Sequence, residues 1–118
     1  GVLTGNSERA AEVKLRHFQL DHFFKFGGFG DFHSDRNDVA RLALASARSF
    51  LGERFDASRL WVVGDTVNDI VCARAINAKV VAVETGGASI SELEAAAPDS
   101  VLKSLDDCRV FFEILELA

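Results

Sequence analysis

The sequence contains little of several residue types whose abundance would indicate a special class of protein. It has one proline and nine glycines among 118 residues, so no low-complexity tract indicates disorder or a long linker. Its 13 basic residues are outnumbered by 18 acidic ones, and the net charge of −5 disfavours binding to nucleic acid, which needs a basic face. No apolar run approaches the roughly 18 residues of a membrane span, so we expect no membrane partner.

Cysteine is also scarce, because only Cys72 and Cys108 are present and they show no CxxC or metal-ligand spacing. We interpret both as reduced thiols in or near the core, which favours a cytoplasmic protein. The first residues lack the charged and then apolar pattern of a secretory signal. The sequence starts without methionine and inside an expected strand, so we expect a processed or partial protein.

What is present is an ordinary globular composition, 48% hydrophobic and 26% charged, of a length that predicts one domain spanning residues 1–118. Apolar runs and helical periodicity alternate along the chain with short connections. Strands are expected at 1–4, within 23–32, and at 60–63, 79–83 and 100–103; helices are expected at 7–20, 38–51, 65–76, 89–97 and 106–117.

This alternation is typical of an α/β fold in which helices cover both faces of a mostly parallel sheet. Ligands of such sheets bind beyond the carboxyl ends of the strands, so the residues that follow each strand are candidates for a site. They are Thr4-Gly5-Asn6, His33 to Arg36, Gly64-Asp65-Thr66 and Glu84-Thr85-Gly86.

Asp65 follows the most apolar strand, and Asp69 comes one helical turn later. Two carboxylates at one strand end repel each other unless a cation lies beside them, and oxygen ligands suit Mg²⁺. A structural interpretation is equally open, in which Asp65 caps the helix and Asp69 is a favourable charge in its first turn.

Thr4, Gly5 and Asn6 combine a hydroxyl, a small residue and backbone N–H groups at a helix start, which can form a phosphate seat. Arg36 could balance the charge of a phosphoryl group. Taken singly, the first segment is more often an ordinary turn and the arginine more often a surface residue. His33 lies near the expected cleft and is a weaker candidate for contact with a substrate.

In this order the segments resemble motifs II, III and IV of the haloacid dehalogenase-like (HAD) hydrolases. The resemblance covers nearly the whole chain and includes LWVVGDTVNDIVCARAINAKVVAVETG and the closing AAAPDSVLKSLDD. It implies a Rossmann-like three-layer α/β/α sandwich. The Gly-Asp-Thr start of the last motif favours the phosphatase branch, similar to phosphoglycolate phosphatases.

The resemblance implies a role for each matched residue. Thr4 would bind the phosphoryl oxygens with the backbone of Gly5 and Asn6 nearby, and Arg36 would neutralise nucleophile and phosphate, although the family more often has Lys-Pro there. Asp65 would ligate Mg²⁺, with Asp69 acting on a water of the ion or on the basic residue. The substrate would be a small phosphorylated metabolite, cleaved through an aspartyl-phosphate.

The family's first motif, DxDx(T/V), has no counterpart, because DFHSD at 31–35 comes after motif II and follows no strong strand. We therefore expect this to be the C-terminal part of a HAD-like core domain, with the first central strand, the cap and the attacking aspartate outside the chain. Such a chain would be inactive alone, and would self-associate or require the missing N-terminal portion. The alternative is a non-catalytic HAD-like binding or regulatory module.

Overall fold

The computed structural model describes residues 1–116, and these form two compact units, residues 1–56 and the remainder from residue 57 onward. Each unit is described by itself below. Within the described part of the chain, no helix is both long and apolar enough to cross a membrane.

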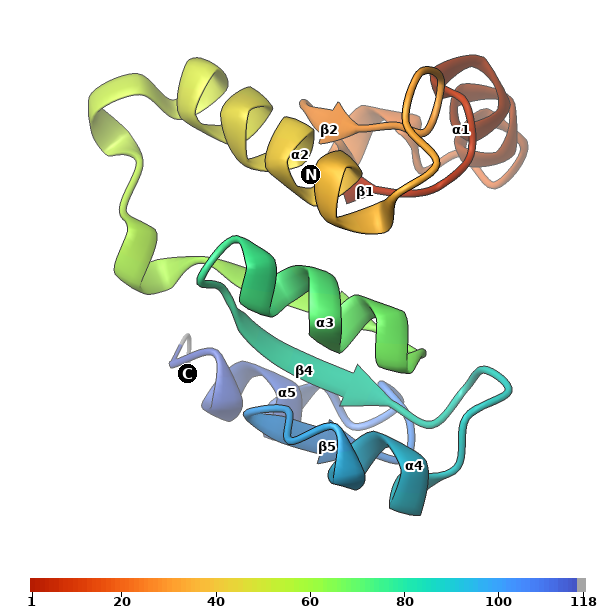
Figure 1. Cartoon of the computed structure of the whole chain (residues 1–118), viewed down its shortest axis with the longest axis vertical. Coiled ribbons are helices and arrows are strands. Elements are labelled where there is room, and N and C mark those ends of the chain that lie inside the picture. The colour runs from red at the N-terminus through yellow and green to blue at the C-terminus, as the bar shows by residue number, and fades with distance from the viewer. Residues whose placement is uncertain (117–118) are drawn as a thin grey trace. The chain divides into compact units, whose positions relative to one another are not determined.

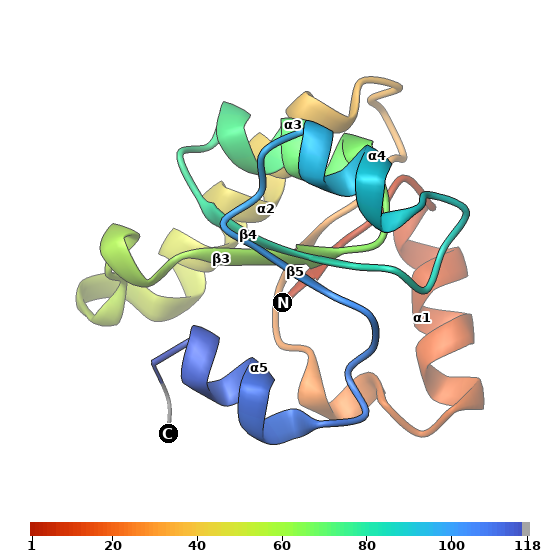
Figure 2. The ribbon, with the colours of Figure 1, turned by 90° about the horizontal axis from the view of Figure 1, so that it is seen from below.

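The first unit is a small parallel α/β assembly. Strands β1 and β2 pair in parallel, with Val2 opposite Gly27 and Leu3 opposite Gly28. Helix α2 lies on one face of this pair and α1 on the other (Figure 2). The bounds are β1 (Val2–Leu3), α1 (Glu8–His17), a 3₁₀ turn (Asp21–Phe23), β2 (Gly27–Gly28) and α2 (Arg36–Leu51).

Gly28 allows α2 to approach β2 closely. A Cβ added to Gly28 would overlap the carbonyl oxygen of Val39 and lie 2.6 Å from the backbone nitrogen of Ala43. Val39 is fully buried at this contact. The glycine-rich segment therefore serves close packing of a strand under a helix, as its composition predicts.

The second unit contains a three-stranded parallel sheet in the order β3-β4-β5. Figures 1 and 2 show α3 and α4 on one face of this sheet and α5 on the other. The bounds are β3 (Trp61–Gly64), α3 (Val67–Ala75), β4 (Lys79–Val83), α4 (Ile90–Ala95), β5 (Ser100–Leu102) and α5 (Cys108–Ile114).

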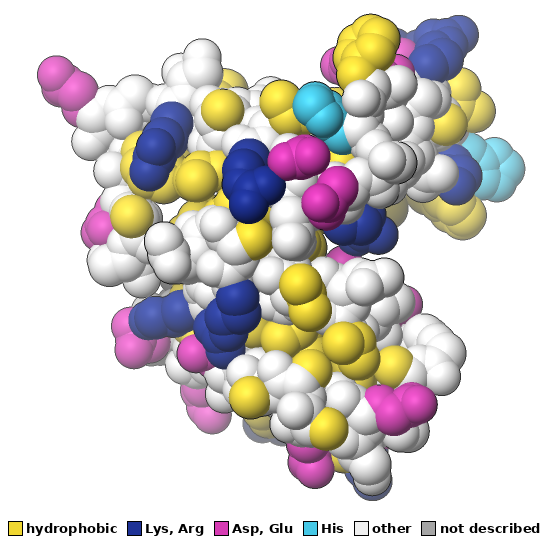
Figure 3. Space-filling view, in the orientation of Figure 1, with side chains coloured by type: hydrophobic (Ala, Val, Ile, Leu, Met, Phe, Trp, Pro, Cys, Tyr) yellow, Lys and Arg dark blue, Asp and Glu magenta, His cyan; other side chains and the backbone are white. Residues whose placement is uncertain are grey.

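Strand β4 is the centre of the second core. Val80 and Val81 are fully buried, and Ile70 of α3 and Leu93 of α4 bury their side chains in the same unit. Burial of each such side chain stabilises the fold by about 1.5–3 kcal/mol. Charged side chains of both signs are scattered over the face that Figure 3 shows.

The predicted element order and the parallel α/β class are confirmed, since every strand pair in the described residues is parallel. The strands fall into two sheets, which agrees with the expectation of an incomplete sheet. Asn77 adopts a φ of +54° where α3 stops, and Gly52 a φ of +54° after α2, as predicted for left-handed end positions.

Several element boundaries differ from the prediction because of side-chain caps. Helix α2 starts at Arg36 rather than at residue 38, since the Asp35 carboxylate accepts a hydrogen bond from the Asn37 N–H at 2.8 Å. Helix α5 starts at Cys108 after the cap Asp107, and the predicted end of that helix at residue 117 lies outside the described residues.

The two cysteines have different environments. Neither forms a disulfide bond, and Cys72 is fully buried, as predicted. Cys108 is exposed, so its predicted place in or near the core is wrong. It is the first residue of α5, a helix in which no residue is buried.

An ion pair joins the end of α3 to the chain entering β5. Arg74 Nη1 lies 2.9 Å from Asp99 Oδ2, and the same oxygen accepts a hydrogen bond from the Val80 N–H at 2.7 Å. Arg74 also donates to the carbonyl of Ala97 at 2.9 Å. Burial pushes the pKa of Asp99 upward, but the bonds from Val80 and Arg74 and the charges of Arg74 and Lys79 outweigh it and lower that pKa.

We expect Asp99→Asn to lower the free energy of unfolding by about 1 kcal/mol at pH 7, because the pair is partly exposed and a neutral amide binds Arg74 more weakly. The folded-state pKa of Asp99 is depressed, so its contribution is present above the unfolded pKa and is lost as the pH falls through the folded value. Urea denaturation at pH 7 and near pH 2.5 should show the difference between the variant and the parent shrinking in acid. An equal difference at both pH values would contradict this assignment.

Candidate functional site

The turn between β3 and α3 is held by the carboxylate of Asp69. Asp69 Oδ2 accepts hydrogen bonds from the backbone N–H of Asp65 at 3.1 Å and of Thr66 at 3.0 Å. The Thr66 hydroxyl donates to the same oxygen at 2.8 Å and accepts from the Asp69 N–H at 3.3 Å. This is a capping box in which Thr66, not Asp65, is the N-cap, and Asp69 is only 8% exposed.

Asp65 follows β3 directly and is partly exposed. Two glycines make room around the acid pair. A Cβ added to Gly86 would lie 2.6 Å from Asp65 Oδ2, and one added to Gly64 would overlap the carboxylate of Asp69. The loop between β4 and α4 therefore passes close beside the Asp65 carboxylate, and the end of β3 lies against Asp69.

The donor set of this turn fits a hard cation that binds through oxygen. Asp69 Oδ2 already accepts from three donors, so Asp65 has the greater capacity to bind an ion directly. Mg²⁺ commonly takes one or two protein carboxylates and completes its shell with water and substrate phosphate. Residues 1–116 contain no group of three or more His, Cys, Asp or Glu side chains that could hold a metal.

In the first unit, the loop after β1 presents the hydroxyl of Thr4. Thr4 Oγ1 accepts hydrogen bonds from the backbone N–H and the side-chain amide of Asn6, each at 3.1 Å. A hydroxyl has two acceptor positions and one proton, so these two bonds leave donation as its further capacity. The Thr4 hydroxyl therefore keeps its proton as a donor.

Arg36 lies beside the same loop. A Cβ built on Gly5 would be 3.6 Å from Arg36 Cδ and 4.0 Å from Arg36 Nη1, so the Arg36 side chain lies over Gly5. Arg36 is the first residue of α2, where the helix dipole disfavours a positive charge. A cation in this position is most favourable when an anion lies close by.

The loop after β2 supports this arrangement. The Gly30 N–H donates to the carbonyl oxygen of Asn6 at 2.8 Å, and a Cβ on Gly30 would overlap the carbonyl oxygen of Gly5. Asp31 Oδ2 accepts from the Glu8 N–H at 2.9 Å, and the Ser7 hydroxyl accepts from the N–H of Ala10.

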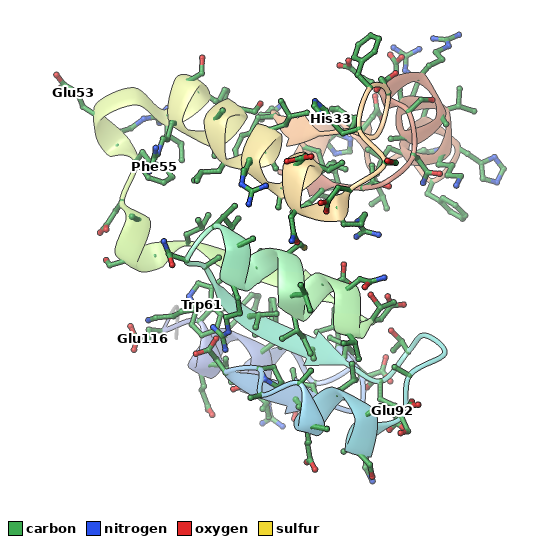
Figure 4. The ribbon with its side chains drawn as sticks, viewed as in Figure 1. His33, Glu53, Phe55, Trp61, Glu92 and Glu116 are labelled. Atoms are coloured by element: carbon green, nitrogen blue, oxygen red, sulfur yellow. The ribbon has the colours of Figure 1, made fainter. Side chains whose placement is uncertain are left out.

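These caps use N–H groups at the start of α1 that a phosphate seat would have needed. Whether Thr4 and Arg36 bind an anion in the first unit stays a prediction. His33 lies in the exposed loop between β2 and α2 (Figure 4), and its proposed contact with a substrate stays a prediction.

A groove of the first unit is separate from these residues. It has a volume of about 820 Å³ and lies beside α1, between Leu15, Phe24 and Phe29. None of the predicted site residues lines it.

The structure thus brings Thr4, Gly5, Asn6 and Arg36 together in one unit, and Asp65 and Asp69 together in the other. That the two groups share one site stays a prediction. Sequence reasoning missed the contact between Gly86 and Asp65, and it missed the role of Asp31. The Gly86-Gly87 pair after β4 was the signal that could have indicated the close approach to Asp65. Nothing in the sequence indicated that Asp31 accepts a hydrogen bond from the Glu8 N–H.

The family model described as HAD-hydrolase-like matches residues 38–108. A search of curated proteins found no match.

Solved structures share the fold. A protein described as a "predicted phosphatase" from Clostridium acetobutylicum is 27% identical with a TM-score of 0.78, over 98% of this chain and 51% of the other. A "putative phosphatase" from Clostridium difficile is 24% identical with a TM-score of 0.79, over 93% and 50%. A haloacid dehalogenase-like hydrolase from Streptococcus pneumoniae is 17% identical with a TM-score of 0.75, over 93% and 50%.

The chain therefore spans about half the length of these structures. The matched family segment covers more than half of the sequence and includes the acid pair and the turn that holds it. The chain belongs to the HAD-hydrolase-like family.

Proposed function

We propose that the chain is part of a Mg²⁺-dependent phosphatase that hydrolyses a small phosphate ester, with the attacking aspartate outside these 118 residues. The observation that carries the proposal is the Asp65–Asp69 turn, in which one carboxylate builds the loop and the other stays partly exposed beside it. Membership of a hydrolase family and the phosphatase descriptions of two matched structures support it. A cytoplasmic location is proposed with it, on the two free thiols.

The reaction would proceed in two displacements at phosphorus. In the first, an aspartate oxygen from outside these residues forms a bond to phosphorus, and the bond from phosphorus to the ester oxygen breaks. The ester oxygen takes a proton from an acid that also lies outside these residues, and the alcohol leaves. In the second, water attacks phosphorus while it gives a proton to the conjugate base of that acid, and the bond from phosphorus to the aspartate breaks, which releases inorganic phosphate.

The residues of this chain would bind and orient. The Thr4 hydroxyl would donate a hydrogen bond to a phosphoryl oxygen, and Arg36 would offset the negative charge that concentrates there. Asp65 would hold the metal ion, and Asp69 would keep Asp65 in place through the turn. When bound, Mg²⁺ would supply Lewis-acid stabilisation of charge on the phosphoryl oxygens.

The direct test of the function is hydrolysis of p-nitrophenyl phosphate. The 118-residue chain alone is expected to release no product above the uncatalysed rate. A longer polypeptide that contains an upstream DxDx(T/V) segment should hydrolyse the ester only with Mg²⁺. If the natural polypeptide has no such segment and no activity, the non-catalytic binding module is the correct function.

Substitutions should show that Asp65 binds the metal ion and that Asp69 stabilises the turn. Asp65→Asn should lower Mg²⁺ affinity at least tenfold and change the free energy of unfolding by less than about 0.5 kcal/mol. Asp69→Ala should cost about 1–3 kcal/mol of stability, because it leaves donors of the turn without an acceptor. NMR titration with Mg²⁺ and urea denaturation measure the two effects. Equal stability losses in both variants would contradict the division of roles.

Gly86 offers a test of the loop beside Asp65, with a matched control in its neighbour. Gly86→Ala places a methyl group 2.6 Å from Asp65 Oδ2 and should weaken Mg²⁺ binding several-fold, as measured by the same titration. Gly87→Ala meets no atom within 4 Å and should leave the affinity unchanged. If both variants bind Mg²⁺ like the parent, the ion does not bind beside this loop.

Thr4 can be tested through binding of inorganic phosphate. Thr4→Val removes the donor and should weaken phosphate binding about tenfold, since a hydrogen bond to a charged group is worth about 1.5–3 kcal/mol. Thr4→Ser keeps the hydroxyl and should bind like the parent. Chemical-shift titration with phosphate at constant ionic strength gives the affinities. A Thr4→Val variant with parental affinity would remove this residue from the site.

A further inference from the structure

The loop after β1 is held at two points by the backbone of β2 and of the loop that follows it. The Thr4 N–H donates to the Gly28 carbonyl oxygen at 3.1 Å, and the Gly30 N–H donates to the Asn6 carbonyl oxygen at 2.8 Å. A Cβ added to Gly30 would overlap the carbonyl oxygen of Gly5, so the two loops are in direct contact. Since the N–H and the side-chain amide of Asn6 both donate to Thr4 Oγ1, the position of Asn6 affects the position of this hydroxyl.

The side chain of Asp31 adds a third tether between the same two loops. Asp31 Oδ2 accepts a hydrogen bond from the Glu8 N–H at 2.9 Å, across 23 positions of the sequence. Glu8 is the first residue of α1, and the first N–H groups of a helix have no partner within it. The cap residue Ser7 already uses its hydroxyl for the N–H of Ala10. Asp31 therefore holds the end of the loop after β1, at the point where α1 begins.

We propose that Asp31 is a positioning residue for phosphate binding, which holds the Thr4 hydroxyl in place through the start of α1. The inference rests on the proposed function, in which Thr4 donates to a phosphoryl oxygen. A loop that is already ordered loses less conformational entropy when the anion binds, so a tether raises affinity without touching the ligand. The charge of a carboxylate opposes an anion, so any gain in phosphate affinity from Asp31 has to come through the loop.

The other basic group of this unit has a support of its own. Arg36 is the first residue of α2, and the Asp35 carboxylate caps that helix by accepting from the Asn37 N–H at 2.8 Å. This cap does not involve Asp31. Loss of the Asp31 tether should therefore act on phosphate binding through Thr4 and leave the position of Arg36 unchanged.

Chemical-shift titration of the 118-residue chain with inorganic phosphate, at constant ionic strength, tests this role. Asp31→Ala should weaken binding about fivefold, because the loop must then be ordered when the anion binds. Asp31→Asn keeps an oxygen acceptor for the Glu8 N–H and should bind phosphate at least as tightly as the parent. Asp107→Ala is the matched control, since Asp107 caps α5 by accepting from the Arg109 N–H at 3.1 Å, and it should bind like the parent.

A double substitution separates positioning from a general loss of stability. If Asp31 acts through the Thr4 hydroxyl, Thr4→Val combined with Asp31→Ala should bind phosphate no more weakly than Thr4→Val alone. Hydrogen exchange gives a readout without phosphate. The amide of Asn6, which donates to Thr4 Oγ1, should exchange faster in Asp31→Ala and at the parental rate in Asp31→Asn and Asp107→Ala.

The outcomes distinguish this inference from the proposed function. If Asp31→Ala binds phosphate as tightly as the parent or more tightly, while Thr4→Val binds it weakly, the positioning role is overturned and the Thr4 site stands. Additive losses in the double variant, or unchanged exchange at Asn6, would also overturn the positioning role. A Thr4→Val variant with parental affinity, or a parent chain that binds no phosphate, would overturn the Thr4 site and this inference with it.

Discussion

One buried carboxylate organises the second unit of the protein. Asp69 Oδ2 accepts hydrogen bonds from the backbone N–H groups of Asp65 and Thr66 and from the hydroxyl of Thr66, in the turn between β3 and α3. A buried acceptor with three donors costs little to desolvate, and its negative charge favours the first turn of the helix. The position of Asp65, and with it the candidate metal site, depends on this arrangement.

The same turn shows that the structural and the functional interpretations of the acid pair are compatible. Asp69 serves the fold, as a capping-box partner would, and Asp65 remains partly exposed beside Gly86. In the first unit the pattern is similar. Asn6 organises the loop through the Thr4 hydroxyl, and Arg36 lies beside Gly5 at a helix start that disfavours its charge.

The two sheets of the described chain agree with the expectation of an incomplete fold. Strand β3 is as apolar as an interior strand, yet it lies at an edge of its sheet, and the chain spans about half of each matched structure. An exposed apolar edge is costly and prone to pairing. Catalysis by an aspartate from outside these residues is the proposal that addresses what completes this fold.

The sequence by itself determined the order of elements, the parallel α/β class and the residues that follow each strand. These features depend on local periodicity and on caps, such as Ser7, Thr66 and Ser89, whose partners lie within one helical turn. Element ends were less accurate, as at α2 and α5, because the choice among neighbouring polar caps depends on packing.

Only the tertiary structure decided which polar atoms are already in use. Asp31 occupies the start of α1, and Gly86 approaches Asp65, although both pairs are far apart in the sequence. Such contacts arise when loops at the ends of neighbouring strands fold against each other, and no local pattern records them. The sequence therefore named the candidate residues, and the folded chain assigned Asp69 to the turn and left Asp65 available to a ligand.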